Sequence, residues 1–314
     1  MYKYKVVIIG AGNIGAMFDS PESKEILTHA HGFSKSSYFQ LKGFYDVDKK
    51  KAQEAAERWD TKAFSSLEDA LENTDVVCCC VPDEYHYAVL KQISNYSVKL
   101  VVTEKPLTKT LQEAEEIQKL YQGIPCIVNY SRRFLKEFQE LKKEILGYGK
   151  FLKGNGYYGK GILHNGSHMV DLLEYLLGPI EKYENPEHEI SDFWKDDPSC
   201  DVKLYAGKGI FRMNSIDCSV ATIFELDLFF EKARIRILEG GSCLEIYSVQ
   251  KSPTYAGYFN YVLEEVRQVD YSNAILGMIE NVEHYLEREE TLKCCLSSGK
   301  RVLEWCLNIR GDLD

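Results

Sequence analysis

The sequence predicts an α/β fold built as two domains: an N-terminal Rossmann domain with a doubly wound parallel sheet, and a C-terminal α+β domain with a large, mostly antiparallel open sheet. Three observations predict this arrangement. Short apolar runs alternate with helical patterns up to about residue 125, which is typical of βαβ units. A glycine-rich turn follows the first apolar run directly. Beyond about residue 150, longer runs with a period of two are joined by tight turns, which is typical of antiparallel strands.

The N-terminal strands are expected to be buried on both faces, because their apolar runs are continuous rather than alternating. The stretch Asp19–Ile26 contains Pro21 and several polar residues, and we expect it to interrupt the helix that follows the first strand. We expect strands at Lys5–Ile9, up to Phe44–Tyr45, at Asp75–Val81, at Leu100–Thr103 and at Cys126–Asn129. Helices are expected at Lys49–Arg58, Tyr85–Ile93 and Leu111–Tyr121.

A change in the sequence pattern marks the second domain, so we expect the chain to divide into residues 1–125 and 126–314. Only two residues separate the strand patterns Ala221–Phe230 and Ala233–Leu238, which predicts a hairpin. A turn at Gly240-Gly241 then leads to a strand at Cys243–Val249. Helices are expected at Gly166–Leu177, at residues 275–286 and at Val302–Ile309.

The composition excludes several classes of protein. The 314-residue chain has a formal charge of −10 and no block of Lys and Arg, which argues against a nucleic acid partner. No apolar stretch approaches the ~18 residues of a membrane span. The chain runs from Met1 directly into a strand pattern, so no signal peptide is expected. Three of the ten cysteines, Cys78, Cys79 and Cys80, are adjacent in an apolar run, which indicates buried thiols in the reducing cytoplasm.

The glycine-rich turn has the spacing of a dinucleotide-binding loop, since Gly10-Ala11-Gly12-Asn13-Ile14-Gly15 is GxGxxG placed directly after a strand. Gly10 permits a tight turn, Gly12 lets the backbone approach a pyrophosphate, and Gly15 lets the next helix pack against the strand. The N-terminus of that helix offers N–H groups to the phosphates. The alternative is a glycine-rich turn with a purely structural role.

Asp46 ends the second predicted strand, where a carboxylate accepts hydrogen bonds from the adenosine ribose and repels a 2′-phosphate. This position favours NAD. NADP stays possible, because Asp46 lies further from the glycine turn than is usual and because Lys49, Lys50 and Lys51 follow it.

Two further segments carry a resemblance to a known family. Glu104-Lys105-Pro106 follows an apolar strand, and the segment Gly161–Asp171 leads into a helix and contains His168. Together with the glycine turn, Pro82 after the cysteine run, Arg132-Arg133 and the C-terminal hairpins, they resemble the glucose–fructose oxidoreductase and inositol dehydrogenase (Gfo/Idh/MocA) family over nearly the whole chain.

The resemblance implies an NAD(P)-dependent oxidoreductase that moves a hydride between nicotinamide and a hydroxyl-bearing carbon of a sugar, nucleotide sugar or cyclitol. It implies that Lys105 and His168 serve this transfer. An imidazole can take the hydroxyl proton, and an ammonium group stabilises the developing alkoxide. Pro82, His86 and Glu104 are expected near the cofactor.

His164 is a departure from the family, because many inositol-dehydrogenase-like members have an aspartate four residues before the histidine. We expect His164 to bind substrate or to share in proton transfer. On a helix that included residue 164, His164, His168 and Asp171 would share one face and could hold a metal ion. The family needs no metal, and we expect none.

Substrate contacts are expected from Tyr130, Arg132, Tyr158 and Asn165, which lie next to the implied active-site segments. The alternatives are ion pairs between domains for the arginine and core or surface positions for the tyrosines. Family resemblance implies a homodimer or homotetramer. Two other functions stay open: a cofactor-binding regulator without catalysis, and a reductase of C=N or C=C bonds, such as the related biliverdin reductases.

Overall fold

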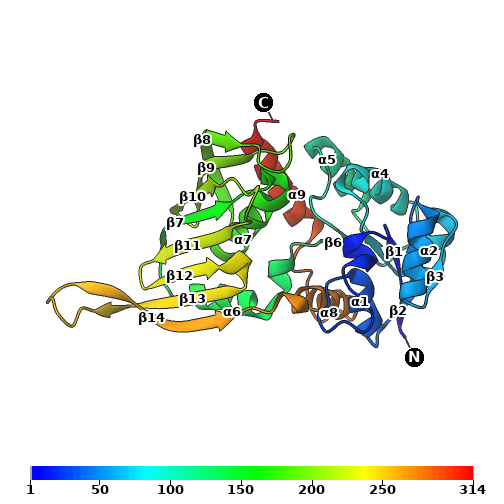
Figure 1. Cartoon of the computed structure of the whole chain (residues 1–314), viewed down its shortest axis with the longest axis horizontal. Coiled ribbons are helices and arrows are strands. Elements are labelled where there is room, and N and C mark those ends of the chain that lie inside the picture. The colour runs from blue at the N-terminus through cyan, green and yellow to red at the C-terminus, as the bar shows by residue number, and fades with distance from the viewer. Residues whose placement is uncertain (1, 314) are drawn as a thin grey trace. The chain divides into compact units, whose positions relative to one another are not determined.

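The computed structural model describes residues 2–313, and these residues form two compact units (Figure 1). Unit 1 runs up to Phe134 and takes in Ser272–Leu303, and unit 2 consists of Leu135–Tyr271 together with the residues from Glu304 onward. No helix of the described residues is long and apolar enough to cross a membrane.

Unit 1 contains a six-stranded sheet in the order β3-β2-β1-β4-β5-β6, and every strand pairs in parallel with its neighbours. This order is that of a Rossmann fold, which confirms the predicted fold class of the N-terminal part. The strands are β1 Tyr4–Ile9, β2 Phe39–Tyr45, β3 Lys62–Ala63, β4 Val76–Cys79, β5 Leu100–Thr103 and β6 Cys126–Val128. The helices between them are α1 His29–Lys35, α2 Lys49–Arg58, α3 Leu67–Leu71, α4 Asp83–Ile93 and α5 Leu111–Leu120.

The core of unit 1 lies on the central strands β1, β4 and β5, whose apolar side chains are fully buried on both faces. Cys78 and Cys79 belong to this core, and burial raises the pKa of the Cys79 thiol to about 12. No disulfide joins any of the ten cysteines, all of which lie in the described part of the chain. The cysteine run therefore packs as small apolar residues.

The helix after β1 is interrupted, as the sequence predicts. One wide turn, η1 Asn13–Met17, is followed by irregular chain, and α1 starts only at His29. The buried carboxylate of Asp19 fixes this insertion. It accepts hydrogen bonds from the Leu27 amide at 2.6 Å and from the Thr28 hydroxyl at 2.5 Å, and it lies 2.9 Å from His31 Nδ1.

Unit 2 contains an eight-stranded sheet in the order β14-β13-β12-β11-β7-β10-β9-β8, in which β7 and β10 form the parallel pair and the other neighbours are antiparallel. The predicted hairpin is confirmed as β11 and β12. The strands are β7 Phe151–Tyr158, β8 Ile180–Ile190, β9 Ser199–Ala206, β10 Gly209–Ser215, β11 Phe224–Phe230, β12 Ala233–Leu238, β13 Cys243–Lys251 and β14 Phe259–Gln268.

One face of this sheet is buried, because side chains alternate between buried and half-buried along β9 to β12. Helix α7 (Ser167–Leu177) packs on the buried face, where a Cβ at Gly156 of β7 would lie 2.5 Å from Met169 Sδ. Helix α6 (Lys136–Ile145) also belongs to this unit, and the β13–β14 hairpin extends beyond the rest of the sheet (Figure 1).

The units differ from the predicted division at residue 125 in two ways. Strand β6 pairs with β5, so unit 1 continues to Phe134. Helix α8 (Ala274–Leu286) returns to unit 1 and packs on α1, where a Cβ at Gly32 would lie 2.6 Å from Ile275 Cγ2. The last helix, α9 (Leu296–Arg310), begins in unit 1 and ends in unit 2.

Candidate functional site

The glycine turn is fixed by contacts that leave no room for side chains at two of its three glycines. Gly10 has a φ of +96°, and a Cβ on it would lie 2.6 Å from the Cys80 carbonyl carbon and the Val81 nitrogen. A Cβ on Gly15 would lie 2.3 Å from the Gly10 oxygen. Gly12 differs, because a Cβ there would meet no atom within 4 Å.

A cavity of about 620 Å³ opens beside this turn, at the carboxyl ends of β1, β2 and β4. This edge is where ligands bind in open parallel sheets. The charged and amide side chains that line the cavity are Asn13, Asp46, Asp48 and Lys51. The remaining lining residues include Gly10, Gly12, Ile14, Val47, Val81, Pro82, Tyr85, Ala88 and Val89.

Asp46 connects the end of β2 to the glycine turn. Its Oδ2 accepts a hydrogen bond from the Ala11 amide at 2.8 Å, and its Oδ1 accepts one from the Asp48 amide at 2.9 Å. Both oxygens keep a second lone pair for ribose hydroxyls. Asp46 therefore holds the turn in place and borders the cavity at once.

The residues present fit a dinucleotide. Gly12 lines the cavity, and no atom lies within 4 Å of the position that its Cβ would take. A pyrophosphate could therefore approach the backbone closely at this residue. Two carboxylates and one ammonium group, those of Asp46, Asp48 and Lys51, surround the end of β2. This balance of charge favours a ribose with free hydroxyls over a 2′-phosphate.

Glu104, at the end of β5, lies in a hydrogen-bonded cluster that the sequence analysis did not predict. Its Oε1 accepts from His29 Nε2 and from Asn129 Nδ2, each at 2.8 Å. Burial opposes the charged form of Glu104, but His29, Asn129 and the nearby charge of Lys105 together lower the pKa of its carboxyl group. Glu104 thus places a carboxylate beside half-buried Lys105 and does not line the cavity.

We expected His86 to contact the cofactor, but its hydrogen-bond partners are backbone carbonyl groups. It is buried, with Nδ1 2.7 Å from the Pro106 carbonyl oxygen and Nε2 3.0 Å from the Val81 carbonyl oxygen. Both ring nitrogens therefore face backbone, and His86 ties the loop after β4 to the loop after β5. Pro82 lines the cavity, and the Lys105–Pro106 peptide bond is cis.

Unit 2 places His164 and His168 at the start of α7. His168 lies in the first turn of α7, and His164 lies in the preceding turn, η3 (Gly161–Gly166). His164 Nδ1 is 2.7 Å from Oδ2 of Asp197, and the imidazole stacks on the Trp194 ring with centroids 4.5 Å apart. Asn165 uses its amide to donate to the Gly159 carbonyl at 2.9 Å, so it stabilises the turn before η3.

Several predicted substrate residues are buried. Tyr158 is fully buried, and its hydroxyl accepts from the Cys200 amide at 2.8 Å and donates to the Cys200 carbonyl at 2.9 Å. The expectation that Tyr158 contacts substrate was wrong, because this side chain has no exposed surface. Tyr130 and Arg132 are also buried.

Sequence reasoning missed Asp197, Trp194, His29 and Asn129. Asp197 and Trp194 lie on the loop between β8 and β9, and nothing in their spacing from His164 indicates contact. His29 begins α1 and Asn129 follows β6, and neither belongs to a sequence motif. No group of three or more His, Cys, Asp or Glu residues suited to a metal ion occurs within residues 2–313.

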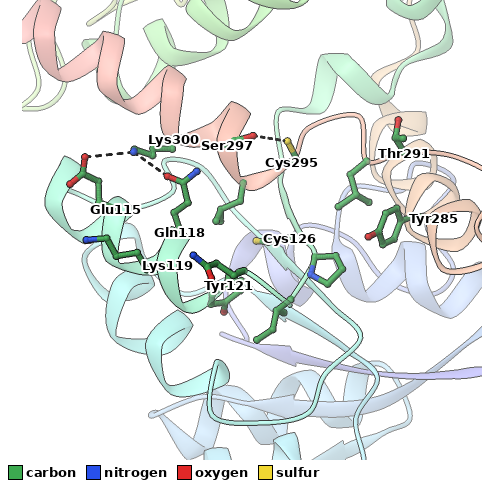
Figure 2. A pocket seen from close by; sticks show the side chains of 15 residues that line it. Glu115, Gln118, Lys119, Tyr121, Cys126, Tyr285, Thr291, Cys295, Ser297 and Lys300 are labelled. Carbon is green, nitrogen blue, oxygen red and sulfur yellow. Dashed lines mark hydrogen bonds and ion pairs between the residues drawn. The ribbon is translucent and has the colours of Figure 1, made fainter.

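A second cavity of unit 1, of about 860 Å³, lies at the opposite edge of the sheet, where β6 begins (Figure 2). Cys295 and Lys300 of α9 and its N-terminal flank line it together with Glu115 and Gln118 of α5. Lys300 Nζ lies 3.6 Å from Glu115 and donates to Gln118 at 3.1 Å. This cavity lies beside the amino end of β6, whereas ligands of such sheets bind at the carboxyl ends of the strands, so we do not assign the cofactor to it.

Comparison with known proteins identifies one matching family model and several relatives. Residues 4–131 match the family model GFO_IDH_MocA, described as "Oxidoreductase family, NAD-binding Rossmann fold". A Salmonella typhimurium protein named as an oxidoreductase, YceM, is 27% identical over 46% of this chain and 44% of its own length. The UDP-N-acetylglucosamine 3-dehydrogenase of Acidithiobacillus ferrooxidans is 24% identical over 49% of this chain and 45% of its own. The chain thus spans less than half the length of each curated relative in these matches.

Solved structures share the fold over nearly the whole chain. The UDP-N-acetylglucosamine 3-dehydrogenase GnnA from Acidithiobacillus ferrooxidans superposes with a TM-score of 0.78 at 18% identity, covering 99% of this chain and 98% of that one. The WlbA dehydrogenase from Bordetella pertussis, solved with NADH and UDP-GlcNAcA, gives a TM-score of 0.76 at 16% identity, covering 99% and 96%. At these identities the likeness concerns the fold, and it confirms the two-part fold class.

Proposed function

From the premise that residues 4–131 match the Gfo/Idh/MocA family of oxidoreductases with an NAD-binding Rossmann fold, we propose that this chain transfers a hydride between NAD and a hydroxyl-bearing carbon of a sugar or nucleotide sugar. The observation that supports this most is the cavity beside the glycine turn, with Asp46 at its border and Lys105 at the carboxyl end of the neighbouring strand β5.

The N-terminal unit would hold the cofactor by its backbone and one carboxylate. The glycine turn would receive the pyrophosphate, and Asp46 would accept hydrogen bonds from the adenosine ribose. When bound, NAD supplies the carbon that accepts or donates the hydride. The surroundings of Asp46 support NAD rather than NADP, since Val47, which follows it in the cavity lining, carries no positive charge.

Lys105 and His168 would serve the substrate hydroxyl. In the direction of oxidation, the C–H electron pair leaves as hydride while the O–H proton leaves to a base, so that the C–O bond becomes a carbonyl. His168 is the proposed base, because an imidazole changes its protonation near neutral pH. Lys105 is proposed to donate a hydrogen bond to the oxygen as negative charge develops on it. The carboxylate of Glu104 would keep that ammonium group charged and oriented.

A sugar-like substrate is supported by the residues next to His164 in unit 2. Trp194 and Phe193 are exposed by 40% and 57%, and they contact each other edge to face. Lys160 Nζ lies 5.1 Å from the centre of the Phe193 ring. Aromatic faces pack on sugar rings or nucleobases, and an ammonium group suits a phosphate. The relative named as a UDP-N-acetylglucosamine 3-dehydrogenase and the WlbA structure with bound UDP-GlcNAcA support the same class.

A turnover screen tests the proposal. The purified chain would be mixed with NAD or NADP and a panel of sugars, nucleotide sugars and cyclitols, and the absorbance of reduced nicotinamide would be followed. We expect turnover with at least one nucleotide sugar or sugar. Lys105→Ala and His168→Ala are expected to lower kcat by about 100-fold or more while the dissociation constant for NADH stays within about twofold. Full turnover in both variants would refute the assigned roles.

The screen is also informative if no substrate is turned over but NADH still binds. In that case the chain would be a cofactor-binding protein without dehydrogenase activity on these substrates. A screen of C=N and C=C substrates with NADH would then separate a reductase from a regulator.

A further inference from the structure

The loop between β8 and β9, residues 191–198, places a buried carboxylate beside His164. Asp197 is only 2% exposed, and its Oδ2 lies 2.7 Å from His164 Nδ1. The same carboxylate accepts hydrogen bonds from the amides of Leu163 at 3.0 Å and His164 at 3.1 Å. The loop is therefore attached to the turn that carries His164 by three hydrogen bonds to one side chain.

The neighbours of Asp197 identify which ring nitrogen carries the hydrogen. Two backbone N–H groups donate to the carboxylate, and Arg310 Nη1 lies 3.7 Å from Oδ1. Surroundings made of donors and positive charge stabilise an ionised carboxylate, which can only accept. The Nδ1 of His164 must then be the donor in the 2.7 Å contact. In a neutral imidazole the other nitrogen, Nε2, consequently has a lone pair and acts as an acceptor.

A second contact fixes the ring plane. Trp194, on the same loop, stacks on the His164 imidazole at 4.5 Å between centroids and 17° between planes. Asp197 acts in the plane of the ring and Trp194 acts on its face, so the two contacts restrain different rotations. Gly161, whose φ is +86°, allows the Asp197 carboxylate to come this close, because a Cβ at that position would lie 2.0 Å from Asp197 Oδ2.

We propose that His164 and Asp197 form a carboxylate–imidazole pair whose Nε2 accepts a hydrogen bond from a hydroxyl group of the substrate, with Asp197 as the positioning residue. The pair has the net charge of one carboxylate but presents it through an imidazole nitrogen. It therefore favours a substrate that offers a hydroxyl donor at this point and disfavours one that offers a carboxylate or phosphate oxygen. The substrate part of this inference depends on the proposed oxidoreductase function, whereas the pair itself does not.

The first test measures the pair without any substrate. The ¹⁵N chemical shifts of the His164 ring would be recorded on the whole chain and assigned by difference with His164→Gln. We expect a protonated Nδ1 and a lone-pair Nε2. In Asp197→Asn the amide oxygen can still accept from the backbone, but the NH₂ group donates to Nδ1, so we expect the tautomer to reverse. A protonated Nε2 in the unaltered neutral chain would overturn the proposal whether or not the protein has enzymatic activity.

Asp192→Asn is the matched control. Asp192 lies on the same loop and accepts from the amides of Lys160 and Cys218, both at 2.9 Å, but it does not contact His164. We expect this variant to keep the original tautomer. Reversal in Asp192→Asn as well would show that any loosening of the loop changes His164, and the specific role of Asp197 would be lost.

The second test uses the substrate found in the turnover screen. Asp197→Asn and His164→Gln are each expected to lower kcat/KM by about 100-fold, with NADH affinity within about twofold of the unaltered chain. The double variant is expected to lose no more than either single variant, because the two residues act as one unit. Additive losses would contradict the pair. If the screen finds no substrate, the proposed function fails, while the ring tautomer still decides the pairing.

Discussion

The Oδ2 atom of Asp46 accepts a hydrogen bond from the Ala11 amide at 2.8 Å, which joins the end of β2 to the glycine turn. A residue expected to contact only the cofactor therefore also shapes the backbone that would bind it. Substitution of Asp46 should consequently affect both the affinity for NAD and the choice between NAD and NADP.

We predict that Asp46→Ser weakens NADH binding by about tenfold or more and weakens NADPH binding less, because the repulsion of a 2′-phosphate is removed. Titration of both cofactors by intrinsic fluorescence would measure the two dissociation constants. Asp69→Asn is the control, since Asp69 lies on α3, accepts a hydrogen bond from the Ser65 hydroxyl at 2.9 Å and does not line the cavity. An unchanged ratio of NADH to NADPH affinity in Asp46→Ser would contradict the role of Asp46.

Substitution of the first glycine of the turn should lower stability, whereas substitution of the second should weaken NADH binding. Gly10→Ala forces a Cβ to 2.6 Å from the Val81 nitrogen at a φ of +96°, so we expect the free energy of unfolding to fall by about 2 kcal/mol or more. Gly12→Ala has a φ of −81° and meets no atom within 4 Å, so we expect little loss of stability but at least about tenfold weaker NADH binding. Urea unfolding and cofactor titration of both variants would separate the two effects.

Glu104 should contribute to stability in a pH-dependent way. Its pKa is lowered from the ordinary value of 4.5 in the folded chain, although burial opposes this, because His29, Asn129 and Lys105 stabilise the carboxylate. A lowered pKa adds stability above the unfolded-state value and loses it as the pH falls through the folded-state value. We therefore expect Glu104→Gln to be less stable than the unaltered chain near neutral pH, with the difference shrinking below about pH 4.5. Urea unfolding at a series of pH values would measure it.

Asn129→Asp serves as a partner experiment for the same cluster. A second carboxylate 2.8 Å from Glu104 cannot donate a hydrogen bond when ionised and repels the first charge. We expect this variant to lose stability near neutral pH and to recover part of it on acidification. A pH-independent difference would argue against a charged Glu104.

Cys295 should react faster with an alkylating reagent than the buried cysteines Cys78 and Cys126. Burial opposes its ionisation, but hydrogen bonds from Ser297 and Ser298 lower the pKa of its thiol. Cys78 and Cys126, by contrast, have pKa values raised by complete burial. We expect iodoacetamide to modify Cys295 at least about tenfold faster than these two at neutral pH. Peptide mass spectrometry over time would measure the rates, and Ser297→Ala should slow the reaction.

The Rossmann part of the fold could be predicted from the sequence because its signals are local. Continuous apolar runs, helix caps and the glycine turn all lie within a few residues of what they determine, and helix α2 was predicted with its observed limits, Lys49–Arg58. The hairpin of β11 and β12 was predictable for the same reason. Strand β14 was not, because nearly all of its side chains are exposed and it lacks the alternation that marks a half-buried strand.

Residues of the candidate site could be predicted only where they belong to a recognisable sequence motif. The glycine turn, Asp46 and Lys105 follow strands directly, whereas Asp197 reaches His164 from a loop 33 residues further along the chain. Tyr158, by contrast, was predicted to contact substrate but is buried. Alternation along β7 turns Tyr157 outward and Tyr158 inward, and the sequence alone did not give that register.

The return of residues 272–303 to unit 1 has a consequence for synthesis on the ribosome. Tyr4, in the first strand, donates a hydrogen bond to Glu287 at 2.7 Å, and the Val128 amide of β6 donates to the Cys294 carbonyl at 3.1 Å. These partners emerge only after the whole segment from Leu135 to Tyr271 has been translated. The unit that begins first is thus completed late, and the nascent chain carries the six-stranded sheet of unit 1 without helix α8 while the second sheet is still being made.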